Sequence, residues 1–248
     1  LYKILFAMPY SIDQFSQITS INKLVLRTWE NRYGLLKAKR TATNIRSYSD
    51  ELLVKALNIK LLMDCGYKIS FIAKKNNEDL FEMVNEIQTS KNQQLSKNFY
   101  INKFIESAMT YNESLFNNSY RSGLSKFGII GLYEKIVLPT LSKIGLFWLT
   151  NRINPGQEHF LSELIKQKMF SEIDSIQHKN NKTKNWLLYL PANEYHEIGL
   201  IFAKLLLIKN GYNVIYLGAN VPNESIIHIT KKKKINNVLF FTISNFSK

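Results

Sequence analysis

Cysteine is almost absent from this sequence, with Cys65 as the only one in 248 residues. A single cysteine excludes an intramolecular disulfide framework and a cysteine-rich zinc site. Long apolar runs are also missing, because none reaches the roughly eighteen residues that a membrane-spanning helix needs. Residues 1–11 are too short for a secretory signal peptide and lack its cleavage site. These absences predict a cytoplasmic protein that has no membrane partner.

Acidic residues are scarce as well: 19 Asp and Glu stand against 33 Lys and Arg, for a net charge of +14. The excess favours a polyanionic partner, although charge by itself bears on association rather than on fold. Hydrophobic residues make up 45% and charged residues 21%, which is ordinary for a globular chain and excludes wholesale disorder. At roughly 150 residues per domain, the length predicts one to three domains.

Much of the positive charge lies in one segment. From Lys23 to Arg46 there are seven basic side chains and a single acid, Glu30, which leaves a net charge of +6. A second cluster, Lys231–Lys234, is typical of a solvated helix end, since helix C-termini favour cations.

The basic segment coincides with a compact local pattern. Ser11 with Gln14 three residues later is typical of a capped helix start. Residues 21–33 carry apolar side chains at helical spacing, and Gly34 is suited to end that helix in a left-handed conformation. Two short helices joined by a tight turn predict a helix-turn-helix, and residues 44–48 are consistent with a β-wing.

Separated motifs in this region together resemble the MerR-type winged helix-turn-helix, over residues 9–78. The motifs are Tyr10-Ser11-Ile12, Arg27-Thr28-Trp29-Glu30, Arg32-Tyr33-Gly34-Leu35, Asn44-Ile45-Arg46-Ser47-Tyr48-Ser49 and Gly66-Tyr67-Lys68-Ile69. The resemblance implies that the second helix enters the major groove of double-stranded DNA and that the wing contacts the backbone.

Carried over to this sequence, the resemblance assigns two groups of DNA-binding residues. Lys23 and Arg27 would face the groove, where arginine can bind guanine through two hydrogen bonds. The expected phosphate contacts come from Arg32, Tyr33, Arg46 and Tyr48. Trp29 is expected to be a core residue instead.

The middle of the chain, residues 79–180, has long stretches of helical spacing that predict a bundle of about four helices. Trp148 followed by Glu158-His159 is the one constellation there that stands out. By itself it means little, because a lone histidine is more often a surface or core residue than a ligand.

The last part, residues 184–248, alternates strand and helix patterns. Strands are predicted at 185–190, 212–217 and 237–243, with helices at 196–209 and from 224 to about 230. This order predicts a parallel sheet, in which ligands bind at the carboxyl ends of the strands. The loop from Glu194 to Gly199 lies at that edge.

The pattern Glu194-x-His196-x-x-Gly199, followed by Gly211-Tyr212 and the segment 216–222, resembles the cobalamin-binding domain. The resemblance implies that His196 is the lower axial ligand of cobalt and that Glu194 fixes its tautomer. Gly199 would let the helix approach the cofactor. The remaining expected contacts to the cofactor are Gly218, Thr242 and Ser244.

The three segments occur in the order found in B12-dependent MerR-type photoreceptor repressors of carotenoid genes. That resemblance places Trp148 over the upper face of the corrin and Glu158 and His159 near the adenosyl group, with Gln157 and Phe160 along the same wall. Leu149 departs from the light-driven members, which have a histidine there, and this puts the light reaction in doubt. The sheet also ends after three strands, which predicts a truncated chain or a loss of full cofactor binding.

The sequence therefore predicts an α plus α/β protein made of a winged helix-turn-helix, a helical bundle and an incomplete Rossmann-like parallel sheet. The expected function is a non-enzymatic transcriptional regulator that binds DNA as a homodimer or homotetramer and senses adenosylcobalamin or methylcobalamin. Two alternatives stay open: a corrinoid-binding subunit of a B12-dependent enzyme, and a degenerate regulator that no longer binds B12.

Overall fold

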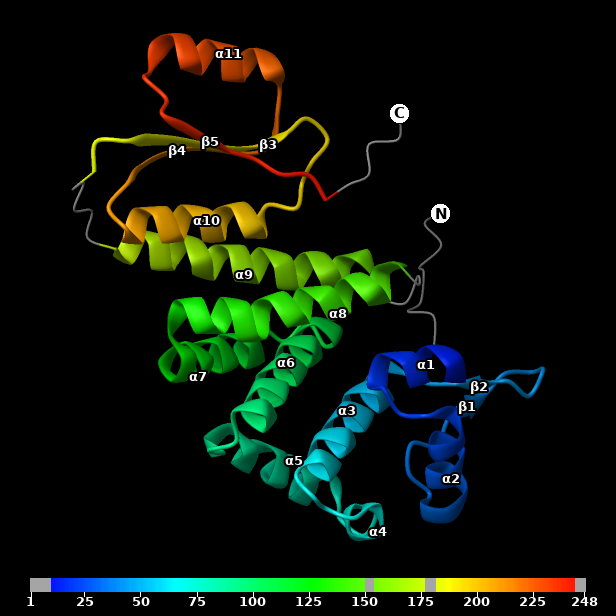
Figure 1. The fold of residues 1–248 in the computed structure, drawn as a ribbon. Helices are drawn as coiled ribbons and strands as arrows, with labels where there is room; N and C mark the ends of the chain where they lie inside the picture. Colours follow the sequence, from blue (N-terminus) through cyan, green and yellow to red (C-terminus); the bar gives the residue numbers. More distant parts are fainter. Residues whose placement is uncertain (1–9, 150–153, 177–181, 244–248) are drawn as a thin grey trace. The chain divides into compact units, whose positions relative to one another are not determined.

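The computed structural model describes residues 10–149, 154–176 and 182–243 (Figure 1). The chain divides into two compact units, residues 1–161 and 162–248. Among the described residues, no helix is both long enough and apolar enough to cross a membrane.

The first unit begins with the expected helix-turn-helix and wing. Its elements are α1 (Ile12–Thr19), α2 (Lys23–Tyr33), β1 (Lys39–Arg40), β2 (Arg46–Ser47), α3 (Asp50–Asp64) and α4 (Ile69–Ile72). Ser11 and Gln14 form a reciprocal capping box at the start of α1. Gly34 ends α2 at φ 66°, a left-handed conformation that costs glycine little. The strands β1 and β2 pair antiparallel as the wing.

Helices make up the rest of the first unit, in the order α5 (Asn77–Glu86), the 3₁₀ turn η1 (Ile87–Thr89), α6 (Gln93–Met109), α7 (Glu113–Leu132), the π-helical turn η2 (Tyr133–Val137) and α8 (Leu138–Leu149). The helix α9 (Pro155–Ser175) follows and contains the boundary between the two units. Gly128 kinks α7 with φ 65°, since this backbone conformation interrupts the helix.

The winged helix and the bundle share one core, which is why they form a single compact unit. Asn102 on α6 donates its amide N–H to the Leu57 carbonyl oxygen on α3 at 3.2 Å. Tyr10 donates its hydroxyl to Asp50 Oδ1 at 2.5 Å, and the same side chain reaches Met109 of α6. These buried contacts tie the start of the chain to the bundle.

The second unit contains a three-stranded parallel sheet, which confirms the α/β prediction. Its elements are β3 (Asn185–Pro191), α10 (Ile198–Lys209), β4 (Asn213–Val221), α11 (Asn223–Lys232) and β5 (Asn237–Leu239). The strand order is β4-β3-β5. The helices α10 and α11 lie on opposite faces of the sheet (Figure 1). Leu188, Leu190 and Leu200 form the centre of its core.

Three predicted boundaries in this unit were wrong. The strand β4 continues to Val221, whereas the prediction ended it at residue 217. The other two errors share one physical reason. The helix α10 begins at Ile198 rather than at residue 196, and β5 ends at Leu239 rather than at 243. The Glu194 carboxylate accepts hydrogen bonds from the backbone N–H groups of both His196 and Ile243. These bonds satisfy the backbone outside the helix and the strand, so neither element needs to extend.

Candidate DNA-binding surface and cofactor site

The exposed face of α2 carries the residues expected to enter a DNA groove. Leu26 and Trp29 are buried on the opposite face, so the prediction that Trp29 is a core residue is confirmed. Lys23 forms an ion pair with Asp13 of α1. Within the described residues, no acidic side chain pairs with Arg27. Arg27 is therefore the more available cation on this face.

The expected phosphate-binding residues fall into three environments. Arg32 is exposed in the last turn of α2, with its guanidinium 5.5 Å from the ring centroid of Tyr33. Arg46 on the wing donates from Nε to Glu30 Oε2 at 2.6 Å, which fixes the wing against α2. Its remaining guanidinium N–H groups stay available to a partner.

Tyr48 is placed differently from the prediction. Only 1% of the residue is exposed, and its ring stacks on Phe15 at 4.2 Å between centroids. Its hydroxyl is buried without a hydrogen-bond partner. Burial raises the pKa of this hydroxyl, with Glu30 adding to the shift. Tyr48 is thus a packing residue, and the prediction that it contacts phosphate is wrong because its hydroxyl does not reach the surface.

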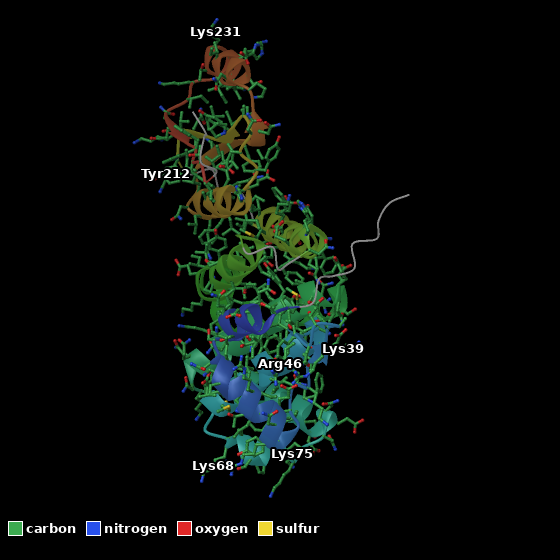
Figure 2. The ribbon with its side chains drawn as sticks, turned by 90° about the vertical axis from the view of Figure 1, so that its right-hand side faces the viewer. Lys39, Arg46, Lys68, Lys75, Tyr212 and Lys231 are labelled. Carbon is green, nitrogen blue, oxygen red and sulfur yellow. The ribbon has the colours of Figure 1, made fainter. Side chains whose placement is uncertain are left out.

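A further basic and aromatic patch surrounds α4, a segment for which the sequence analysis predicted no DNA contact. Lys68 and Lys75 project at the same end of the first unit as α2 (Figure 2). The exposed rings of Tyr67 and Phe71 stack at 5.7 Å between centroids. Lys75 lies 5.4 Å from the centroid of Phe71. The motif Gly66-Tyr67-Lys68 marked this segment, but only the fold shows that it lies at the α2 end.

In the second unit, Glu194 organises the loop at the carboxyl end of β3. The residue is fully buried. Its Oε1 accepts the backbone N–H groups of Tyr195 and His196, both at 3.0 Å, and contacts His196 Nδ1 at 2.5 Å. Its Oε2 accepts the backbone N–H of Ile243 at 2.7 Å. One carboxylate therefore joins the loop after β3 to the segment after β5.

His196 is held in place but remains accessible, with 58% of its side chain exposed. The contact from Nδ1 to a carboxylate favours the tautomer in which Nε2 carries a lone pair, as in metal-binding histidines. The site lies between β3 and β5, where the connecting helices switch faces of the sheet. Ligands of open α/β sheets bind at this point. Among the described residues no cluster of three or more His, Cys, Asp or Glu could hold a metal.

A second network supports this loop from the neighbouring strand. Tyr216 on β4 donates its hydroxyl to Glu197 Oε1 at 2.7 Å, and Lys166 lies 3.7 Å from Glu197 Oε2. Burial, followed by the bond to Glu197, raises the pKa of Tyr216. Gly218 has φ 81°, and a Cβ there would lie 3.0 Å from Glu197 Oε1. A side chain at 218 would therefore push Glu197 out of place.

The structure brings only some of the expected cofactor contacts together. Thr242 is exposed beside Ile243, close in sequence to the Glu194 bond, and Gly199 lies in the first turn of α10. Ser244 and the side chain of Trp148 lie outside the described residues, although the backbone of Trp148 belongs to α8.

The other residues predicted to lie near the upper face belong to the first unit. His159 is exposed, and its Nδ1 lies 3.8 Å from Glu158 Oε2. Gln157 is buried and donates its amide to the Met109 carbonyl oxygen at 3.1 Å and to Asp50 Oδ2 at 3.2 Å. Its amide is thus committed to the core, which argues against the predicted place on a cofactor wall.

Comparison with known proteins agrees with this organisation. Residues 10–77 match the model of the MerR HTH family regulatory protein. The HTH-type transcriptional repressor CarH of Myxococcus xanthus is 23% identical over 220 residues, which is 88% of this chain and 73% of CarH. The repressor CarA of the same organism is 23% identical over 222 residues, covering 88% of this chain and 71% of CarA. The N-terminal region is therefore a MerR-type helix-turn-helix domain, as predicted.

One solved structure was also compared, the crystal structure of the methanol:cobalamin methyltransferase complex MtaBC from Methanosarcina barkeri. The match covers 72% of this chain and 70% of that chain, at 16% identity and a TM-score of 0.32.

Proposed function

We propose that this chain is a DNA-binding transcriptional regulator whose second unit binds a cobalamin through His196. The DNA-binding part is supported by the MerR-type domain, by Arg27 on the exposed face of α2, and by the similarity to two named repressors. Among the described residues, no acidic side chain pairs with Arg27. The observation that carries the cofactor part is the pair of Glu194 and His196, a buried carboxylate that orients an exposed imidazole.

In this proposal, α2 lies in the major groove with Arg27 reading a base edge. Arg32 and Arg46 contact phosphates, which set the register of the domain on the duplex. Lys23 contributes less than Arg27, because its ion pair with Asp13 must be broken or shared first. The chain acts as a homo-oligomer, a dimer or a tetramer, because two copies of the reading helix bind two half-sites.

A bound cobalamin would supply a cobalt ion, for which an imidazole nitrogen is a suitable ligand. His196 Nε2 would hold that ion, Glu194 would hold the tautomer, and Gly218 would leave room for the Glu197 carboxylate beside the loop. The buried location of Glu194 fits this role, because an orienting carboxylate works best when water does not compete for it. The cofactor form that we propose is adenosylcobalamin, with methylcobalamin as the alternative.

The cofactor test compares the purified protein with His196→Ala and with the control His228→Ala. His228 is exposed on α11 in the same unit. On addition of adenosylcobalamin or methylcobalamin, wild type and the control are expected to show the same visible spectrum, and His196→Ala a different one. An unchanged spectrum in His196→Ala removes His196 as the ligand. No binding by wild type would leave a regulator that has lost its cofactor.

The DNA test uses a duplex selected from a random library by the wild-type protein. Arg27→Ala is expected to weaken binding by about 1–3 kcal/mol and to relax the preference at one position. Lys231→Ala, on the exposed end of α11, is the control and is expected to bind as wild type. Equal losses in both variants would contradict the assignment of α2 as the reading helix. Light scattering with and without adenosylcobalamin, in darkness and in light, tests the oligomer.

A further inference from the structure

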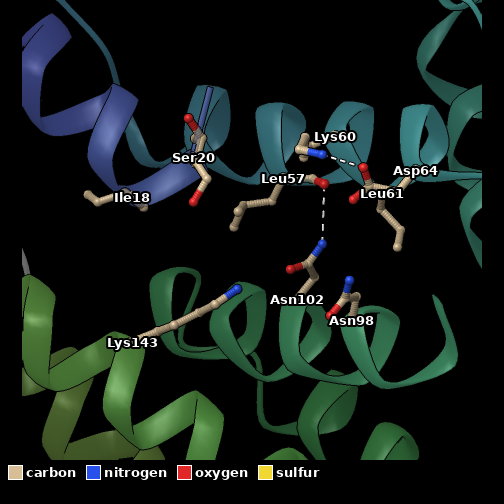
Figure 3. A pocket seen from close by; sticks show the side chains of 10 residues that line it. Ile18, Ser20, Leu57, Lys60, Leu61, Asp64, Asn98, Asn102 and Lys143 are labelled. Atoms are coloured by element: carbon tan, nitrogen blue, oxygen red, sulfur yellow. Dashed lines mark hydrogen bonds and ion pairs between the residues drawn. The ribbon is translucent and has the colours of Figure 1, made fainter. Parts of the chain in front are cut away.

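A cavity of about 160 Å³ lies in the first unit between the DNA-binding domain and the bundle (Figure 3). Its lining comes from the end of α1, from α3, from α6 and from α8. A cavity of about 150 Å³ holds a molecule the size of benzene. The space therefore suits a ligand of about six to eight non-hydrogen atoms.

Lys143 gives the cavity a positive charge. Its side chain extends from α8 toward the space between α3 and α6 (Figure 3). No acidic side chain in the described part of the chain pairs with Lys143, whereas the other lining cation, Lys60, pairs with Asp64 one turn further along α3. Burial lowers the pKa of Lys143, because desolvation disfavours the ammonium form. A bound anion would offset that cost.

Neutral donors line the same space. The Asn98 Oδ1 accepts from Gln94 Nε2 at 3.2 Å, which leaves the Asn98 amide N–H groups for a ligand. The hydroxyl of Ser20, at the end of α1, also faces the cavity. Asn102, by contrast, donates its amide N–H to the Leu57 carbonyl oxygen.

Apolar side chains also line the cavity, and they are Ile18, Leu57 and Leu61. Thr19 and Asp64, whose carboxylate pairs with Lys60, complete the lining. A ligand that matches this set carries one negative charge and a short hydrocarbon part. Inorganic phosphate matches the lysine but has nothing to bury against the apolar side chains, and its hydration is costly to remove.

We propose that this cavity binds a small carboxylate with a short apolar chain, with Lys143 paired to the carboxylate and Ser20 and Asn98 donating hydrogen bonds to it. The ligand would contact α1 and α3 of the DNA-binding domain and α6 and α8 of the bundle together. It would be a small-molecule input to the DNA-binding unit, independent of whether His196 binds a cofactor.

The test titrates the full chain with butyrate, followed by isothermal calorimetry. A ligand of six non-hydrogen atoms is expected to bind with a dissociation constant of roughly 1 mM. Butyramide, which has the same shape without the charge, is the ligand control and is expected to bind at least about tenfold more weakly. Lys143→Met is expected to weaken butyrate binding by at least about tenfold. Lys91→Met, at an exposed lysine of the same unit, is expected to stay within about twofold of wild type.

Four results would overturn the proposal: no saturable binding of butyrate below about 50 mM, equal binding of butyramide, tighter binding of inorganic phosphate, or an unchanged affinity in Lys143→Met. Circular dichroism checks that each variant is folded. If Lys143→Met does not fold, Asn98→Ala replaces it, with an expected severalfold loss of butyrate affinity, and an unchanged affinity in that variant would overturn the proposal equally.

Discussion

Replacing Glu194 with glutamine tests the centre of the candidate cofactor site. The change keeps the size of the side chain but removes its charge and turns one oxygen into an N–H donor. Oε1 accepts two backbone N–H groups and contacts His196 Nδ1, and Oε2 accepts the backbone N–H of Ile243. Whichever way the new amide rotates, its NH₂ group meets at least one N–H donor.

The magnitude follows from the bonds that the carboxylate makes. The favourable orientation of the amide keeps its oxygen on the side of His196 and sacrifices the bond to Ile243. A hydrogen bond to a charged group is worth about 1.5–3 kcal/mol, and the bonds that remain become neutral ones of about 1 kcal/mol. Because Glu194 is fully buried, water does not replace the lost partner. We expect Glu194→Gln to destabilise this edge of the sheet by about 2–4 kcal/mol.

Hydrogen exchange measured by mass spectrometry reports this local stability directly. Peptides that contain Tyr195, His196 and Ile243 are expected to exchange about 30 to 1,000 times faster in Glu194→Gln, since every 1.4 kcal/mol is about tenfold. Glu224→Gln, at an exposed acid on α11, serves as the matched control and should change exchange by less than about threefold. Exchange at wild-type rates in Glu194→Gln would refute the reasoning, because the carboxylate would then not hold the loop.

Three further changes test other parts of the structure. Tyr48→Phe removes a hydroxyl that is buried with no hydrogen-bond partner among the described residues. The variant is expected to keep its DNA affinity and to gain up to about 1 kcal/mol in the free energy of unfolding. Weaker DNA binding in a gel-shift titration would restore Tyr48 as a phosphate contact. Gly218→Ala is expected to destabilise the second unit by about 1–2 kcal/mol, since φ is 81° and the new Cβ would crowd Glu197. Gly145 lies in α8 with open space around a new Cβ, so Gly145→Ala should stabilise the protein by about 0.5 kcal/mol. Thermal melts measure both variants, and a change in stability of the same sign for both would contradict the argument. Glu30→Gln removes the negative charge that pairs with Arg46, at a site where the Glu30 and Arg46 side chains are only 13% and 19% exposed. Urea unfolding should therefore show a loss of about 1–2 kcal/mol rather than none, because a charged hydrogen bond becomes a neutral one.

Features that depend on neighbours in the sequence were predicted well. The capping box at Ser11 and Gln14, the left-handed end of α2 at Gly34 and the short wing follow from local hydrogen bonding and backbone preference. The parallel sheet followed from the alternation of strand and helix patterns. The capping, helix-end and wing signals are each complete within a few residues, and the sheet signal is an order of elements along the chain, so neither kind depends on which side chains meet in space.

Burial was harder to predict where a side chain is both apolar and polar. Tyr48 lies among basic residues of the wing, and its ring nevertheless stacks on Phe15 in the core. Gln157 stood beside residues expected near a cofactor, yet it bonds to Met109 and Asp50. A tyrosine or a glutamine suits either environment, and partners that are distant in the sequence decide between them.

By itself, the sequence determined the kinds of element, the position of the basic helix-turn-helix and the identity of the Glu194–His196 pair. Only the tertiary structure decided that Glu194 is fully buried, that its second oxygen holds the segment after β5, and that Lys143 faces a cavity without an acidic partner in the described part of the chain. These facts depend on which strand ends and helix faces meet in space. Hydrogen bonds and desolvation act over a few ångströms, whereas the residues concerned are separated by dozens of positions in the chain.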